Sequence, residues 1–227
     1  GAWGRNGGAL FPAGVWSEMS LHALDIGAIA EDVSSAWYAS LATSEPPAVG
    51  TTIPDVSRRG AYSWCKAPRR GGEVVEVGAI ARQVVAGHPL VRDLVARGGA
   101  NVMSRVVARL VEIALVVRAM EQWVAAVEPG EPFCVHAPTP DDATGVGLTE
   151  AARGSLGHWL TIRRGRIETY QIVAPTTWNF SPRDAAGTPG ALEQALVGAP
   201  LRDGEKDPVS VQHIVRSFDP CLVCTVH

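Results

Sequence analysis

The last seven residues of the chain combine residue types that bind metal ions. Cys221 and Cys224 are separated by two residues, and His227 follows three positions later. A turn brings residues i and i+3 to the same side of the backbone, so the two sulfurs can bind one ion. Thiolates are soft ligands that favour zinc, iron, nickel or copper over magnesium or calcium. His227 binds either the same ion or a neighbouring one, and the spacing does not distinguish the two.

A structural zinc site is the first alternative for such a motif. It requires a fourth ligand, which Cys65, or Cys134 and His136 on alternate positions, would provide. Structural zinc sites usually lie in small modules, however, whereas this motif ends a chain of 227 residues with four cysteines. A disulfide-stabilised scaffold is not expected in a chain of this size with two cysteines so close together.

Apolar spacing and turn residues predict the elements that position the motif. Apolar residues at helical spacing predict a helix over residues 17–41, and a short strand is expected at 61–64. The clearest helix covers residues 101–127, where Asn101 is suited to cap the N-terminus. Its predicted apolar stripe consists of Val102, Val106, Leu110, Ala114 and Val117.

The C-terminal third predicts a hairpin and two short helices. Residues 160–162 and 167–174 flank a tight turn at 163–166 and are expected to pair as antiparallel strands. A helix is expected to begin at Thr188-Pro189 and to end at Gly198, and another to cover residues 208–218. These elements predict a single α+β unit over residues 1–227, mainly α-helical, with long helices around a buried metal site and small antiparallel β hairpins.

Charge and hydropathy exclude several classes of function. A net charge of -3 provides no electrostatic basis for binding nucleic acid. The most apolar helical stretch, residues 111–117, is too short to predict a transmembrane segment.

The chain begins without Met, an apolar signal core or a basic leader, which indicates either processing or a beginning on another chain.

Three sequence blocks resemble the large subunit of nickel-iron hydrogenases. Residues 217–227 are similar to the family's second cysteine motif, Asp-Pro-Cys-x-x-Cys-x-x-His, and residues 150–159 to Glu-Ala-Pro-Arg-Gly-x-Leu-Gly-His. Residues 170–184 resemble its Val-Pro-Thr-Thr-Trp-Asn and Ser-Pro-Arg-Asp run, and residues 64–69 give a weaker match. The first third of the chain contributes little to this resemblance.

The resemblance implies a role for each residue of the terminal motif. In the family, four cysteines hold nickel, and two of them also bridge to an iron that carries carbon monoxide and cyanide. Cys221 would then be a terminal nickel ligand and Cys224 a nickel-iron bridge. His227 would bind a separate magnesium or similar ion together with the backbone carbonyl of Ile172, and the chain would end at His227 as a matured subunit does.

The resemblance also implies the surroundings of the iron. The diatomic ligands would be surrounded by Arg153, Ala174, Pro175 and Thr176. Buried cyanide needs hydrogen-bond donors, which the Arg153 guanidinium and the Thr176 hydroxyl would provide. Asp219 would hold the Arg153 guanidinium in place. We therefore expect Arg153 and Thr176 on opposite sides of one iron.

Some family features are replaced or missing in this sequence. Ala152, Ala174 and Arg216 stand where the family commonly has Pro, Val and His. The first cysteine motif, Arg-x-Cys-Gly-x-Cys, is absent, and Cys65 and Cys134 lie too far apart to replace it. The other half of the nickel ligands is therefore expected from a companion chain or segment.

The implied activity is heterolytic oxidation of dihydrogen, with electrons leaving through an iron-sulfur small subunit. Iron-sulfur clusters are expected only in that partner. A hydrogen-sensing regulatory hydrogenase and a zinc-stabilised interaction domain are the alternatives. The compartment stays open, either cytoplasmic or membrane-associated through the small subunit.

Overall fold

A computed structural model describes residues 9–39, 44–132, 134 and 136–225 of the chain. The helices are α1 Ala79–Val85, α2 Pro89–Gly98, α3 Val102–Ala125, α4 Pro175–Asn179, α5 Ala191–Leu196, α6 Val209–Ser217 and α7 Leu222–Thr225. The strands are β1 Val15–Ser17, β2 Ser20–His22, β3 Ile29–Asp32, β4 Tyr38–Ala39, β5 Ser44–Glu45, β6 Ile53–Pro54, β7 Ala67–Arg70, β8 Ala143–Ala151, β9 Gly154–Arg163 and β10 Arg166–Val173. These strands pair antiparallel, so the predicted α+β class is confirmed.

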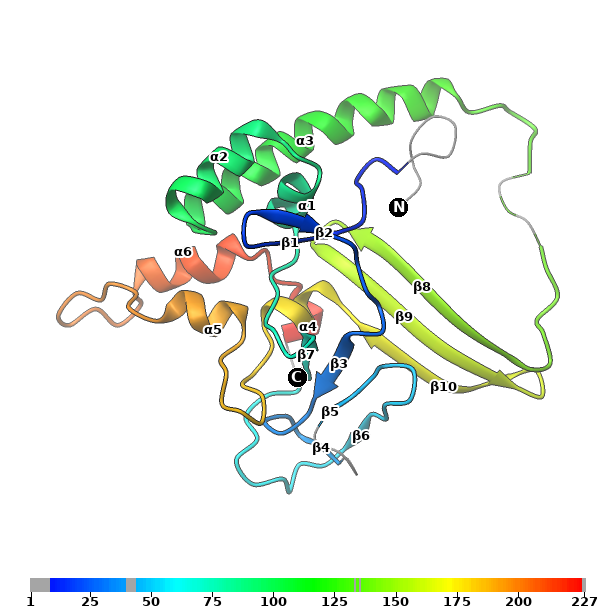
Figure 1. Cartoon of the computed structure of the whole chain (residues 1–227), viewed down its shortest axis with the longest axis horizontal. Helices are drawn as coiled ribbons and strands as arrows, with labels where there is room; N and C mark the ends of the chain where they lie inside the picture. The colour runs from blue at the N-terminus through cyan, green and yellow to red at the C-terminus, as the bar shows by residue number, and fades with distance from the viewer. Residues whose placement is uncertain (1–8, 40–43, 133, 135, 226–227) are drawn as a thin grey trace.

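The elements form three groups around the C-terminal end (Figure 1). Helices α1, α2, α3 and α6 lie together, and the β8–β10 sheet extends away from them. The short strands β3 to β7 form the third group, and the chain ends between the groups, beside α4 and β7 (Figure 1). The terminal motif therefore lies where the three groups meet.

The predicted hairpin is confirmed and is longer than expected. Strands β9 and β10 pair from Arg163 and Arg166 to Gly157 and Val173. Arg164 and Gly165 both have positive φ, of 52° and 68°, which matches the turn type that suits the twist of two-residue hairpins. Strand β8, which the sequence did not predict because glycines interrupt its alternation, pairs along the other edge of β9.

Helix α3 has the predicted cap but buries a different face. The Asn101 side chain accepts a hydrogen bond from the Ser104 backbone N–H at 3.0 Å, as expected for an N-cap. Four residues of the predicted stripe are exposed, namely Val106, Leu110, Ala114 and Val117. The buried face instead carries Ser104, Arg105, Ala108, Glu112 and Ala119. The apolar stripe is therefore present but lies mostly on the exposed side of the helix, which matters for the proposed partner below.

The predicted helix over residues 17–41 is wrong. Glu18 and Met19 have positive φ, of 50° and 60°, and form the tight turn between β1 and β2. Farther along, β3 pairs with both β5 and β7, so its hydrogen bonds go to distant segments. Helical spacing of apolar residues arose here without a helix because non-local pairing overrode it.

Two smaller predictions are also corrected. The strand expected at 61–64 is only an isolated bridge at Ser63, and the strand β7 begins at Ala67. Helix α5 begins at Ala191 rather than at Thr188-Pro189. Thr188 is held in a loop instead, because its N–H donates to Asp184 and its carbonyl accepts from Arg69.

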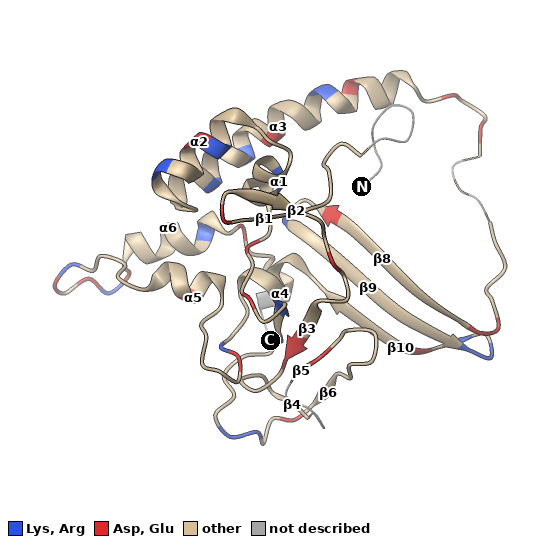
Figure 2. Ribbon diagram, viewed as in Figure 1, with Lys and Arg blue, Asp and Glu red and all other residues tan. Residues whose placement is uncertain are grey.

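Two apolar clusters support the site. The first joins the sheet to α4 and consists of Ile29, Val77, Trp159, Val173 and Trp178. The second joins α1, α2 and α3 and includes Ala79, Ile80, Val84, Val91 and Ala108. Figure 2 shows basic residues on α2, α3 and α6, with acidic residues among them on α2 and α3, in keeping with the small net charge. Among the described residues, none of the helices has the length and apolar character needed to cross a membrane.

Candidate metal centre

Three segments that are distant in sequence meet at the terminal cysteines. They are the β8–β9 turn with Arg153, the start of α4 with Thr176, and the corner at Asp219 that leads into α7. The Cys221 N–H donates to Oγ1 of Thr176 at 3.1 Å. Arg153 Nε lies 3.7 Å from Asp219 Oδ1. The structure thus brings together the residues that the sequence blocks had suggested.

The two cysteines occupy one turn, as their spacing predicted. The Cys224 N–H donates to the Cys221 carbonyl at 3.0 Å, and both side chains are partly exposed. A hydrogen bond with the Cys224 thiol lowers the pKa of Cys221, and the nearby Arg153 guanidinium acts in the same direction. Burial, followed by the hydrogen bond with Cys221, raises the pKa of Cys224 to about 11. Cys221 is therefore the first of the two thiols to ionise.

Thr176 is positioned by the end of strand β10. Ala174 has extended backbone and precedes Pro175, which begins α4, where a missing N–H costs nothing. Thr176 is 3% exposed, and its hydroxyl accepts the Cys221 N–H. A hydroxyl that accepts a hydrogen bond still has its own proton to donate toward the site.

Asp219 holds two arginines loosely beside the terminal cysteines. Its Oδ1 lies 3.7 Å from Arg153 Nε and 3.9 Å from Arg109 Nη1. Asp219 has a φ of 53°, a left-handed conformation that Asp tolerates better than most residues. All three side chains are partly exposed, so these ion pairs orient the groups more than they stabilise the fold.

Two arginines of α3 that the sequence motifs did not indicate hold the corner at Ser217 and Phe218 in place. Arg105 donates to both oxygens of Glu76 and to the Ser217 hydroxyl, and its guanidinium lies 3.7 Å from the Phe218 ring centroid. One turn later, Arg109 donates to the Ser217 carbonyl at 3.0 Å. The available signal was two arginines at i and i+4 on a helix rich in apolar residues.

A buried polar network lies next to Ile172. Lys66 Nζ donates to Glu31 Oε2 at 3.3 Å and to Gln171 Oε1 at 2.9 Å, and all three side chains are buried. Burial raises the pKa of Glu31, while the Lys66 ammonium opposes that shift. Ile172 itself is half-exposed and pairs with His158. The predicted ligand His227 lies outside the described residues.

The other thiols are placed differently from one another. Cys65 is buried, and its Sγ lies 3.9 Å from the Cys224 carbonyl. Cys134 and His136 contact each other at 3.4 Å on an exposed loop between α3 and β8, which arcs away from the C-terminal end (Figure 1). In the part of the chain that the structure describes, no three His, Cys, Asp or Glu side chains form a metal-binding group. A complete zinc site within these residues is not supported.

The turn that carries Arg153 requires a glycine at 154. Gly154 has a φ of 136°, and a methyl group on it would lie 2.7 Å from Val77 Cγ2 and 2.8 Å from the Gly78 nitrogen. The Gly154→Ala variant is therefore expected to lose about 1–3 kcal/mol of stability from backbone strain alone. Thermal unfolding of the assembled protein would measure this loss. Gly147→Ala is the control, because nothing lies within 4 Å of its added methyl group and its φ is ordinary; an equal loss in both variants would contradict the prediction.

A family model for nickel-dependent hydrogenases matches residues 4–227. The chain belongs to the nickel-dependent hydrogenase family. The match begins near the N-terminus, so the expectation that the first third contributes little is corrected. The short strands of that third pack beside the terminal motif, which explains why they form part of the family's fold.

Curated relatives agree with this assignment. The chain is 41% identical over 196 residues to the periplasmic NiFeSe hydrogenase large subunit of Desulfomicrobium baculatum, covering 79% of this chain and 38% of that protein. It is 35% identical over 204 residues to the hydrogenase-1 large chain of Escherichia coli, covering 78% of this chain and 33% of that protein.

Solved structures show the same fold. The H2-activated NiFeSe hydrogenase of Dm. baculatum superposes with a TM-score of 0.88 at 39% identity, covering 96% of this chain and 48% of that one. The reduced Ni-Fe-Se hydrogenase of D. vulgaris Hildenborough superposes with a TM-score of 0.89 at 37% identity, covering 98% of this chain and 50% of that one. The chain thus spans about half the length of these solved chains.

Proposed function

We propose that this chain is the C-terminal part of the catalytic large subunit of a nickel-iron hydrogenase. The activity is heterolytic oxidation of dihydrogen to protons and electrons. The observation that carries the proposal is the meeting of Cys221, Cys224, Arg153 and Thr176 within a chain of the nickel-dependent family. Relatives named as hydrogenase large subunits support it.

Cys221 and Cys224 would provide two thiolates to a nickel-iron centre, and the donor chemistry fits as far as this chain extends. Soft thiolates suit nickel and iron, and an adjacent guanidinium favours their ionised form. When bound, the centre would polarise dihydrogen as a Lewis acid and accept its electrons. Ala174 and Pro175 would form the wall beside the iron, with Arg153 and Thr176 as donors to its carbon monoxide and cyanide ligands.

The proton released from dihydrogen needs an acceptor in the site. Arg153 is a poor base, because a guanidinium stays protonated in proteins. The Sγ of Cys221 is the better candidate in this chain, beside Arg153 and Asp219. Asp219 would orient the guanidinium beside the cysteines, as their 3.7 Å contact suggests.

A divalent ion such as magnesium is proposed as a second metal, held by His227 and the Ile172 carbonyl. The neighbouring residue Gln171 belongs to the buried network of Lys66 and Glu31. Such a network would keep the backbone of β10 in place beside the ion.

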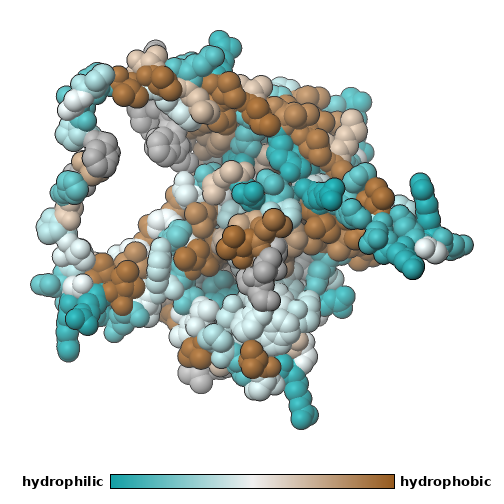
Figure 3. All heavy atoms as spheres, turned by 180° about the vertical axis from the view of Figure 1, so that it is seen from behind, coloured by the Kyte–Doolittle hydropathy of each residue, from teal (hydrophilic) through white to brown (hydrophobic). Residues whose placement is uncertain are grey.

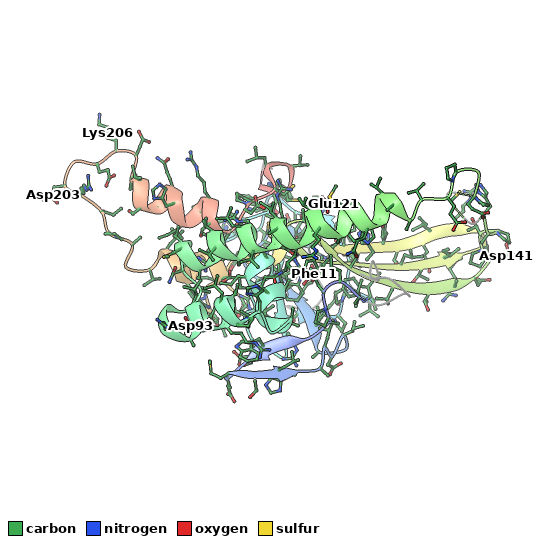
Figure 4. All side chains as sticks on the ribbon, turned by 90° about the horizontal axis from the view of Figure 1, so that it is seen from above. Phe11, Asp93, Glu121, Asp141, Asp203 and Lys206 are labelled. Carbon is green, nitrogen blue, oxygen red and sulfur yellow. The ribbon has the colours of Figure 1, made fainter. Side chains whose placement is uncertain are left out.

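A companion portion of the large subunit is the proposed source of the other nickel ligands. Supporting it, α3 exposes an apolar stripe with alternating steps of three and four residues, the spacing of a seam between two helices. The stripe consists of Met103, Val106, Leu110, Ile113, Val117, Met120 and Val124. Figure 3 shows hydrophobic surface along this helix, and Figure 4 shows α3 lying across the top of the molecule.

The companion portion is expected to pack a helix on this stripe. The Leu110→Glu, Ile113→Glu double variant should then lower co-purification with the companion portion by at least about tenfold, because two charges would be buried in the seam. Leu201→Glu is the control, since Leu201 is 67% exposed between α5 and α6, away from the stripe. Unchanged co-purification of the double variant would contradict the assignment.

Elemental analysis of the assembled protein tests the proposed function. The protein is expressed with the companion portion and an iron-sulfur small subunit. About one nickel per chain is expected, with iron in excess of nickel because the clusters of the small subunit also contain iron. Infrared bands of bound carbon monoxide and cyanide, and dye-coupled dihydrogen oxidation, are the accompanying readouts. A slow turnover with intact bands would indicate a hydrogen sensor, and zinc in place of nickel would refute the proposal.

A further inference from the structure

The arginine of α1 makes the densest set of hydrogen bonds around the Arg153 turn. Arg82 is 6% exposed, and its Nε and Nη2 donate to the two oxygens of Glu112 at 2.6 and 2.7 Å. Its Nη1 donates to Glu150 Oε2 at 2.8 Å. The remaining two donors go to the carbonyls of Ala151 at 2.9 Å and Ala152 at 3.0 Å. All five N–H groups of the guanidinium are therefore used.

These bonds connect three elements to the backbone just before Arg153. Glu112 comes from the buried face of α3, and Glu150 from the end of β8. The Glu150 carboxylate also accepts the Ser155 hydroxyl across the hairpin. The Arg82 guanidinium lies 5.5 Å from the Phe11 ring centroid, and Figure 4 shows Phe11 beneath α3. Arg82 thus joins the helices to the hairpin at its turn.

The opposite side of the turn is held by close backbone contact. Gly154 approaches Val77 and Gly78 so closely that no side chain fits between them. The turn is therefore held from both sides, by the Arg82 hydrogen bonds and by the segment before α1. From this turn, the Arg153 side chain extends to Asp219 and lies near the cysteines.

We propose that Arg82 is a positioning residue that sets the place of the Arg153 guanidinium over the terminal cysteines. Resting on the proposed function, this role makes Arg82 necessary for turnover although it touches neither metal nor substrate. A lysine has three donors on a flexible stem and no planar fork, so it cannot hold two carboxylates and two carbonyls together. The Arg82→Lys variant would free the turn while keeping the buried positive charge.

A double-mutant cycle separates positioning from general stability. Arg82→Lys is expected to lower dihydrogen turnover by about 10–100-fold at unchanged nickel content, the usual cost of losing an outer partner of a metal site. In an Arg153→Lys background the same change should cost less than about threefold, because the group that it positions is already lost. The cyanide infrared bands should shift in the same direction in both single variants.

Arg69→Lys is the matched control. Arg69 is 4% exposed and also uses all five donors, but on Pro68, Ser181, Pro182, Asp184 and Thr188 rather than on the turn. Its effect on turnover should multiply with that of Arg153→Lys. The proposal would be overturned if the turnover effects of Arg82→Lys and Arg153→Lys also multiplied, or if the cyanide bands did not shift.

Hydrogen exchange provides a readout that does not depend on turnover. In the assembled protein, Arg82→Lys should speed amide exchange of residues 151–154 at least about tenfold, and Arg69→Lys should not. If Arg82→Lys assembles poorly, Glu150→Gln removes the negative charge of one partner at a partly exposed position and should give a smaller change in the same amides. Unchanged exchange in these variants would refute the role of Arg82. Absence of nickel and turnover in the unmodified protein would instead refute the proposed function.

Discussion

Cys224→Ser is expected to abolish nickel binding and to lower dihydrogen turnover by more than about 100-fold. Loss of even an outer partner of a ligand costs about 10–100-fold, and Cys224 is proposed as a direct, bridging ligand. A serine hydroxyl is a harder donor that stays protonated near neutral pH, so it cannot replace a thiolate. Cys65 is not a substitute, because it is buried, and burial raises the pKa of its thiol.

The control for this variant is Cys134→Ser. Cys134 is exposed on the loop between α3 and β8, so its replacement should leave nickel content and turnover unchanged. Nickel per chain, measured by elemental analysis, and turnover are determined on the same preparations. Full nickel content in Cys224→Ser would remove this cysteine from the metal centre.

Arg153→Lys is expected to lower turnover by about 100-fold while nickel content stays unchanged. A guanidinium presents a planar set of donors that a lysine ammonium cannot reproduce, and loss of one aligned donor in an active site costs about 10²–10³ in rate. Stability should fall by no more than about 1 kcal/mol, because the pair with Asp219 is long and partly exposed.

Arg163→Lys is the control, because Arg163 is the last residue of β9 and Arg153 lies in the turn directly before the first. Its side chain is 53% exposed, close to the 45% of Arg153, and it also forms a 3.7 Å ion pair, with Asp142. Turnover and thermal unfolding are measured for both variants. Similar turnover in the two would show that the location of Arg153 has no special role, and a large loss of stability in Arg153→Lys would indicate a structural role.

Local signals in the sequence were reliable where the structure is local. The Cys221–Cys224 spacing, the Asn101 cap and the turn at Arg164-Gly165 depend on neighbouring residues, and each occurs as predicted. The N-terminal strands did not follow this rule. Strand β3 takes its partners from β5 and β7, so its conformation depends on residues that a local pattern does not contain.

The candidate site likewise contains residues that the sequence predicted and supporting residues that it did not. The family motifs predicted Arg153, Thr176 and Asp219. They did not predict Arg82, which holds the turn before Arg153. They also did not predict Arg105 and Arg109, which hold the corner at Ser217. A buried arginine looks like a surface residue in sequence, since burial becomes visible only when its acceptors come from other elements. Glu112 on the apolar-rich helix α3 was the nearest hint of such an interior charge.

By itself, the sequence determined the metal-binding residue types, their spacing and the presence of an apolar stripe on α3. The tertiary structure alone decided which way that stripe faces and which charges are buried. Periodicity states only that one side of a helix is apolar, whereas the packing partners determine which side is covered. Here the covered side holds Arg105 and Glu112, which support the site, and the apolar side lies exposed.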